Sequence, residues 1–221
     1  HWHSLNRLQR ELQAALKPHP TLTEAIAFLD RVLGVSSSLT GFAMDNMTRD
    51  DGWRFLIIGR RRERLSFLAN TVANFLRMPS ARGPGCLEWL LELSDSIITY
   101  RSRYSRAPEL LPVLDLLVFD DSNPHGVIFQ ASVVARYLDR MARELDEQSE
   151  SNLPEVLSRL RDFDMESLAH VDFSECHVCA SCEKLADLLK ELDAAVGQLS
   201  AWLGMRYFTH VGDVSRQMMA L

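Results

Sequence analysis

Apolar positions along most of the chain recur every three or four residues, which is the period of an amphipathic α-helix. We find no alternation of apolar and polar residues bounded by hairpin-type turn pairs, the pattern that is typical of half-buried strands. The pattern therefore predicts an all-α fold, a bundle or array of about eight helices without a sheet. The expected helical segments are 2–16, 21–34, 36–46, 48–76, 86–105, 108–119, 124–147, 153–162 and 182–206.

Several helix ends are predicted from particular residues. Thr21 and Glu24 have the spacing of a capping box, and Gly34 is expected to end the helix that they begin. Asn123 followed by Pro124 predicts an N-cap with proline in the first helical position. A polar run at 147–152 is the best candidate for a soft boundary within a single helical domain that covers 1–221.

Composition narrows the function classes. The net charge is −6, which makes nucleic acid or an anionic membrane surface a poor partner. Uninterrupted apolar runs, such as 55–58 and 116–119, are much shorter than the roughly 20 residues of a spanning helix, so we expect no membrane segment. Three of the four cysteines are clustered rather than dispersed as in a disulfide framework, which favours a reducing, cytoplasmic setting.

The most informative segment begins at Trp53. When it is wound at about 100° per residue, Arg60 and Arg64 fall within a stripe of apolar side chains, with Glu63 at its edge. Burial of an unpaired guanidinium costs several kcal/mol, so we predict that both arginines are mostly buried and bonded to carboxylates. This cluster is either an internal ion-pair scaffold or a site for an anion or carboxylate.

A second helix, at 86–105, shows a related pattern. Arg101 lies between Leu90 and Ile98 in the helical projection and is expected to point inward as a third arginine. Tyr100 and Tyr104 flank it and are interpreted as ordinary core aromatics.

Several motifs together resemble one known family. They are Asp45-Asn46-Met47-Thr48-Arg49, Gly52-Trp53-Arg54-Phe55-Leu56, Gly59-Arg60-Arg61-Arg62-Glu63-Arg64, the run from Asp95 to Tyr104, Pro112 to Leu117, Asp120-Asp121-Ser122-Asn123-Pro124, Phe129-Gln130 and Arg206-Tyr207-Phe208-Thr209-His210. In this order they resemble the Alpha-E domain family, a predicted α-helical family named for its Glu-Arg motif. The chain then corresponds to the C-terminal two-thirds of a longer Alpha-E domain, without its N-terminal part.

The resemblance implies which proteins this domain works with, but no catalytic mechanism. Members of the family resemble partners of circularly permuted ATP-grasp proteins, to which they can be fused, and this implies peptide or amide-bond chemistry. The motif positions transfer as a polar cluster of functional or structural character without an assigned catalytic role. They are Asp45, Asn46, Arg49, Trp53, Arg54, Arg60, Glu63, Arg64, Arg101, Asp120 and Asn123.

A cysteine cluster raises the question of a metal. Cys176, Cys179 and Cys182 could reach one zinc ion with His170, His177 or Cys86 as the fourth ligand. In a regular helix, however, the first and last of the three fall on opposite sides, so we predict free thiols and no metal. No phosphate loop, dinucleotide turn or nucleophile elbow is found, so we expect no cofactor and no catalysis by this chain alone.

Three functions follow as hypotheses. The first is a helical accessory or interaction domain that works with an ATP-grasp-type amide-bond-forming ligase. The second is an enzyme that clamps a small carboxylate substrate with Arg49, Arg54, Arg60, Arg64 and Arg101. The third is a purely structural assembly module with an exposed apolar patch. Arginines matched by buried carboxylates would favour a scaffold, and unmatched guanidiniums would favour a binding site.

Overall fold

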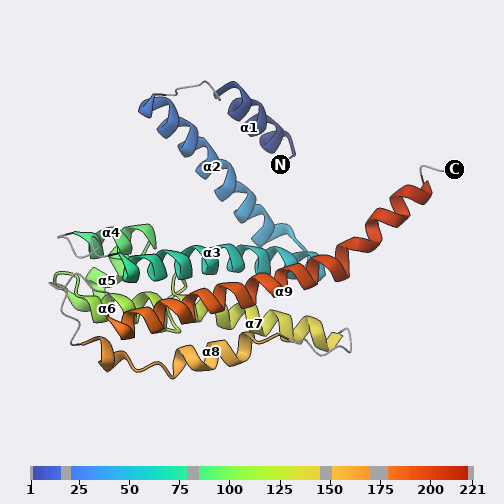
Figure 1. The fold of residues 1–221 in the computed structure, drawn as a ribbon. Helices are drawn as coiled ribbons and strands as arrows, with labels where there is room; N and C mark the ends of the chain where they lie inside the picture. The colour runs from blue at the N-terminus through green and yellow to red at the C-terminus, as the bar shows by residue number, and fades with distance from the viewer. Residues whose placement is uncertain (1, 16–20, 79–84, 145–150, 170–178, 219–221) are drawn as a thin grey trace. The chain divides into compact units, whose positions relative to one another are not determined.

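The computed structural model describes residues 2–15, 21–78, 85–144, 151–169 and 179–218. These residues form nine α-helices, one π-helical turn and one 3₁₀ turn, and none of them lies in a strand (Figure 1). The prediction of an all-α fold is therefore confirmed. The elements are α1 (Trp2–Ala15), α2 (Leu22–Asn46), α3 (Asp51–Arg77), α4 (Cys86–Leu93), α5 (Ile97–Tyr104), α6 (Leu110–Leu114), the π-helical turn η2 (Asp115–Phe119), α7 (Val127–Glu144), α8 (Leu153–Arg161), the 3₁₀ turn η3 (Met165–Leu168) and α9 (Ala180–Met218).

Contacts divide the chain into two compact units, His1–Phe55 and Leu56–Leu221. The division falls inside α3, and each unit is described by itself. The soft boundary expected at 147–152 lies largely on residues outside the described part of the chain.

The first unit contains α1 and α2. Glu11 of α1 pairs with Arg7 at 2.9 Å and with Arg31 of α2 at 3.0 Å. The predicted capping box is confirmed, since the backbone N–H of Thr21 donates to Glu24 Oε2 at 2.9 Å and the backbone N–H of Glu24 donates to Thr21 Oγ1 at 3.3 Å.

The expected helix end at Gly34 is wrong, because α2 continues through it to Asn46 and is 25 residues long. An interior glycine costs a helix only about 1 kcal/mol, and the helix-forming residues on both sides outweigh that cost.

Helix α2 also bears on the expectation about membranes. By length and composition it is long and apolar enough to cross one, with a mean hydropathy of 1.2 and no buried residues in the window concerned. Uninterrupted apolar runs do not reveal this helix, because serines and charged residues interrupt the apolar residues of α2. A signal sequence or a core helix passes the same test, so α2 is a candidate by composition only.

The second unit is built on α3 and α9, which lie side by side (Figure 1). Leu65, Ala69 and Ala73 of α3 and Leu189 and Leu192 of α9 are fully buried. Burial of these side chains removes apolar area from water and stabilises the packed unit.

Polar side chains tie the same two helices together along one flank. The carboxylate of Asp193 on α9 accepts a hydrogen bond from the Ser66 hydroxyl and another from Asn70 Nδ2 at 2.7 Å. Lys190 Nζ donates to Asn70 Oδ1 at 2.6 Å. Because every bond in this network has a fixed direction, it sets both the register and the rotation of α3 against α9.

Two long helices expected from the periodicity are each divided. The segment 86–105 breaks between α4 and α5, where Asp95 has a left-handed backbone with φ of 53°. The segment 108–119 begins as α6 and continues as the π-helical turn η2. The apolar period continues across both breaks, so periodicity alone does not reveal them.

The burial of α3 predicts unequal effects of two nearby truncations. Leu65→Ala should lower the free energy of unfolding by about 2–5 kcal/mol, because it leaves a cavity in the core. Phe67→Ala should cost less than about 1 kcal/mol, because half of that side chain is exposed. Urea unfolding followed by circular dichroism measures both values, and equal losses would show that this rotation of α3 is incorrect.

Candidate functional site

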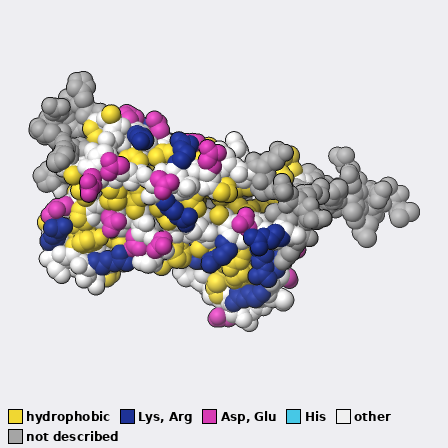
Figure 2. Space-filling model, turned by 90° about the horizontal axis from the view of Figure 1, so that it is seen from below, with side chains coloured by type: hydrophobic (Ala, Val, Ile, Leu, Met, Phe, Trp, Pro, Cys, Tyr) yellow, Lys and Arg dark blue, Asp and Glu magenta, His cyan; other side chains and the backbone are white. Residues whose placement is uncertain are grey.

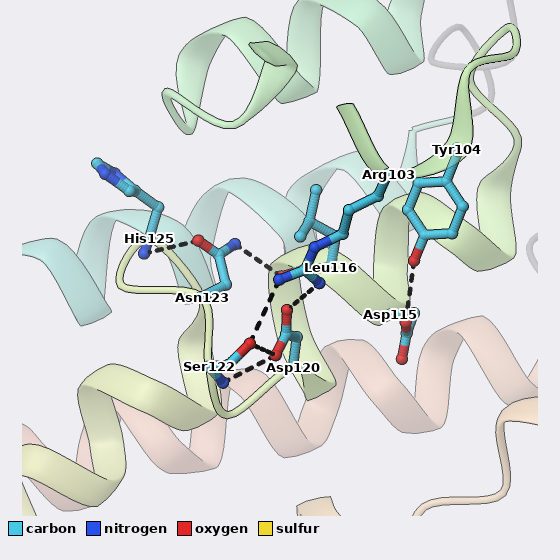
Figure 3. Close-up of polar contacts among 8 residues, drawn as sticks. All are labelled: Arg103, Tyr104, Asp115, Leu116, Asp120, Ser122, Asn123 and His125. Atoms are coloured by element: carbon cyan, nitrogen blue, oxygen red, sulfur yellow. Dashed lines mark hydrogen bonds and ion pairs between the residues drawn. The ribbon is translucent and has the colours of Figure 1, made fainter. Parts of the chain in front are cut away.

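Several polar contacts meet at the turn between η2 and α7 (Figure 3). Asn123 is buried, and its Nδ2 donates to the carbonyl of Leu116 at 2.8 Å while its Oδ1 accepts from the backbone N–H of His125 at 3.0 Å. The asparagine therefore stabilises a turn rather than capping a helix. The expected start of α7 at Pro124 is wrong, since the helix begins at Val127.

Gly126 closes this turn because a larger residue would not fit. A Cβ at this position would lie 3.2 Å from the carbonyl oxygens of both Asn123 and Asp120. Real Cβ atoms rarely approach backbone oxygens so closely, and here neither neighbour is a flexible side-chain end.

Asp120 lies at the start of the turn, facing Arg103 of α5 (Figure 3). Its Oδ2 pairs with the Arg103 guanidinium, and its Oδ1 accepts from the Ser122 hydroxyl at 2.6 Å and from the Ser122 backbone N–H at 2.8 Å. Burial by itself would raise the pKa of Asp120, but the hydrogen bonds from Ser122 and Arg103 outweigh it and hold that pKa below its usual value. The carboxylate thus stays ionised and joins α5 to the turn.

Gln130 connects the turn to α3. Its fully buried side chain donates from Nε2 to the carbonyl of Pro124, and its Oε1 accepts from Arg61 Nη1 at 3.3 Å. The Arg61 guanidinium also lies 5.4 Å from the ring of Phe129. A neutral amide and an aromatic face therefore hold this half-buried arginine, and no carboxylate of the described residues pairs with it.

Other basic groups surround Arg61. Burial lowers the pKa of Arg61, and the like charges of Arg64, Arg60 and Arg136 lower it further. Burial also lowers the pKa of His125, where Arg64 and Arg61 act in the same direction against Asp95. The His125–Asp95 contact is long, at 3.9 Å, and the Asp95 side chain is almost fully exposed. Arg61, Arg64 and His125 therefore place basic groups close together, and nearby carboxylates neutralise little of their charge.

The prediction that Arg60 and Arg64 are buried and paired with carboxylates is wrong. Both are exposed, and neither pairs with a carboxylate among the residues that the structure describes. The buried face of α3 is instead the one that contains Ile57, Arg61 and Leu65. The predicted stripe is thus divided: Ile57, Leu68 and Phe75 are buried, whereas Phe67 is half exposed on the outward face with Arg60 and Arg64.

The other arginine expected to point inward also lies at the surface. Arg101 is exposed and forms a long ion pair of 3.7 Å with Glu88 of α4. Glu63 pairs at 2.6 Å with Arg62 rather than with Arg60 or Arg64. Tyr100 is fully buried as expected, and its hydroxyl accepts from the backbone N–H of Glu109 at 3.1 Å.

The remaining predicted positions lie in the first unit. Arg49 Nη2 donates to the carbonyl of Met44 at 2.7 Å, and its guanidinium lies 4.4 Å from the Trp53 ring. Arg54 pairs with Asp51 at 2.9 Å. Asn46 Nδ2 donates to the carbonyl of Phe42 at 3.3 Å, and Asp45 is exposed. No contact is described for Asp45, and the other residues make local contacts around the α2–α3 connection. Arg49 and Arg54 therefore lie in the first unit, whereas Arg60, Arg64 and Arg101 of the expected five-arginine clamp lie in the second.

The cysteine cluster is only partly described. Cys176, His170 and His177 lie outside the described residues, so the absence of metal stays a prediction. Cys182 is buried at the start of α9, and its backbone N–H lies 3.2 Å from Cys179 Sγ.

Fold and site together define an all-α domain with an arginine-rich helix α3 and a turn built on Asp120 and Asn123. The chain belongs to the Alpha-E family, described as a predicted alpha-helical domain with a conserved ER motif, whose sequence profile matches residues 1–208. The chain contains one Glu-Arg dipeptide, Glu63-Arg64 of α3, and both side chains are exposed.

Relatives with curated sequences are found in mycobacteria. Two uncharacterized proteins of Mycobacterium tuberculosis and one of Mycobacterium bovis are each 28% identical over 210 residues. The alignment covers 88% of this chain and 22% of each relative, so the chain spans about a fifth of their length. No solved structure matches the chain significantly.

The close approach at Gly126 predicts a strong effect of a single methyl group. Gly126→Ala should lower the free energy of unfolding by about 1–3 kcal/mol, because two carbonyl oxygens must move. Gly59→Ala is the matched control, since nothing lies within 4 Å of its added Cβ, and it should be neutral or stabilising. Denaturant unfolding of both variants would contradict this packing if Gly126→Ala were harmless.

The lowered pKa of Asp120 predicts how stability depends on pH. Its ionised form stabilises the folded state above the unfolded pKa of about 4, and that contribution is lost as the pH falls through the lower folded value. Asp120→Asn should therefore cost about 1 kcal/mol at pH 7, and less at pH 3. Urea unfolding at the two pH values measures this difference, and an equal cost at both would argue against an ionised Asp120.

Proposed function

We propose that this domain is a helical accessory module that works with an ATP-grasp-type amide-bond-forming ligase in a peptide-modification pathway. The observation that carries the proposal is the outward face of α3, where exposed arginines continue into an apolar groove. Arg60, Arg64, Phe67, Thr71 and Met78 follow at helical spacing along this face.

The groove lies between α3 and α4 and has a volume of about 480 Å³. It is lined by Phe67, Thr71, Asn74, Phe75, Met78, Cys86, Trp89 and Leu93. Three of the large apolar residues, Phe67, Met78 and Trp89, are each at least half exposed. Aromatic residues, methionine and arginine are the residues enriched at protein interfaces, and such a contiguous set is unusual on a surface that faces only water.

The family and the relatives support a partner that is itself a protein. The resemblance to the Alpha-E family implies association with circularly permuted ATP-grasp proteins. The chain matches about a fifth of the length of its relatives, which leaves room in them for other domains. A surface of arginines beside apolar residues complements a ligase surface that carries acidic residues next to apolar ones.

The interface can be tested with the ATP-grasp protein that is encoded with, or fused to, this domain. Phe67→Glu should weaken the complex by about tenfold or more, because it places a carboxylate in the apolar groove. Isothermal titration calorimetry of the separately purified proteins measures the dissociation constant.

Ile98→Glu is the control for this substitution. Ile98 is 81% exposed on α5 and does not line the groove, so its charge change should leave binding intact. The proposal would be wrong if the two proteins did not associate, or if both variants weakened the complex equally.

A further inference from the structure

A second feature of α3 lies around Arg61, beside the edge of the outward face at Arg64. The side chain of Gln130 bonds both to Arg61 and to the carbonyl of Pro124, so it holds the turn residue His125 close to α3. Arg64 follows Arg61 by one helical turn, and its guanidinium is exposed. Basic groups from α3 and from the turn before α7 thus lie near one another.

The contacts of these groups leave their charge largely unneutralised. Arg61 is bonded to a neutral amide, and within the described part of the chain Arg64 and Arg136 have no carboxylate partner. Among the residues that the structure describes, the carboxylate that contacts His125 is that of Asp95, at 3.9 Å and well exposed to water. Structural arginines that are partly buried are usually paired with carboxylates, because desolvation of an unpaired charge is costly.

We propose that Arg61, Arg64 and His125 form an anion site that binds a carboxylate. A carboxylate between them would accept hydrogen bonds from the guanidinium groups in the planar geometry that arginine favours, and would relieve the repulsion among like charges. Burial and the neighbouring arginines lower the pKa values of both Arg61 and His125, which agrees with a cluster of like charges.

The choice of a carboxylate among anions rests on the proposed function, since an amide-bond-forming ligase consumes an acid. The carboxylate could belong to a small organic acid or to the free C-terminus of a peptide. Both sources present the same group to the arginines, and a direct binding experiment separates them.

The test uses the full chain without any ligase. Succinate and a short apolar peptide, the latter with a free or an amidated C-terminus, are titrated while the imidazole of His125 is followed by NMR. We expect saturable binding that raises the pKa of His125, and therefore tighter binding as the pH falls through that value. Tighter binding of the free-acid peptide than of succinate would identify a C-terminus, and the reverse would identify a small acid.

Two substitutions make the test specific. Arg61→Met keeps an aliphatic stem against Phe129 and should weaken binding at least about tenfold. Arg64→Gln removes an exposed charge without affecting the core and should weaken binding by about threefold or more. Arg159→Met, on α8, removes the same charge outside the cluster and should leave binding unchanged.

Three outcomes would overturn the site. These are no binding of succinate or peptide at about 10 mM, equal binding of inorganic sulfate at matched ionic strength, and binding that survives both Arg61→Met and Arg64→Gln. Because no ligase is present, failure here leaves the groove between α3 and α4 untouched. If instead the ligase and this domain did not associate, carboxylate binding in this test would still establish the anion site.

Discussion

The rotation of α3 about its own axis is the constraint on which the second unit depends. Polar contacts fix it from two flanks, Arg61 to Gln130 on one and Asn70 with Ser66 to Asp193 on the other. A shift by one residue turns a helix by about 100° and would break both sets, leaving a buried amide and a carboxylate unpaired. The fully buried Leu65, between these contacts, can therefore face only the core.

The turn that positions His125 depends on an unusual helix end. In η2 the backbone N–H of Asp120 donates to the carbonyl of Asp115 at 2.8 Å, five residues back, which is the π-helical pattern. The wider turn directs the carbonyl of Leu116 toward the Asn123 side chain, which bonds to it. With Asp120 tied to Arg103, the chain reverses within a few residues and brings α7 back against α3.

The helices can be predicted from the sequence, but the rotation of α3 about its axis cannot. Period and capping residues predict the all-α fold and the start of α2 at Thr21, because these depend on local chemistry. In α3, apolar residues occupy two faces, and nothing in the sequence says which one is buried. Choosing the face of Leu56 and Phe67 made Arg60 and Arg64 seem buried, whereas the face of Leu65 buries Arg61. The bond between Arg61 and Gln130 joins residues 69 positions apart and has no local signal.

Two uses of arginine on one helix follow from this geometry. On the outward face, Arg60 and Arg64 remain hydrated, so their charge costs the fold little and is free to meet a partner. On the inner flank, Arg61 donates a hydrogen bond to the neutral amide of Gln130 and lies over the ring of Phe129. These contacts hold the guanidinium without neutralising its charge. A protein with a net charge of −6 thereby maintains a local positive field, and a scaffold built only for stability would have placed one of its many carboxylates there. Elsewhere on the surface, Figure 2 shows the molecule from below: over much of this face charges of both signs are interspersed, while at one end several basic side chains lie together beside apolar ones. Local excess of one sign on an acidic domain is the physical reason to interpret its arginines as binding groups rather than as internal scaffold.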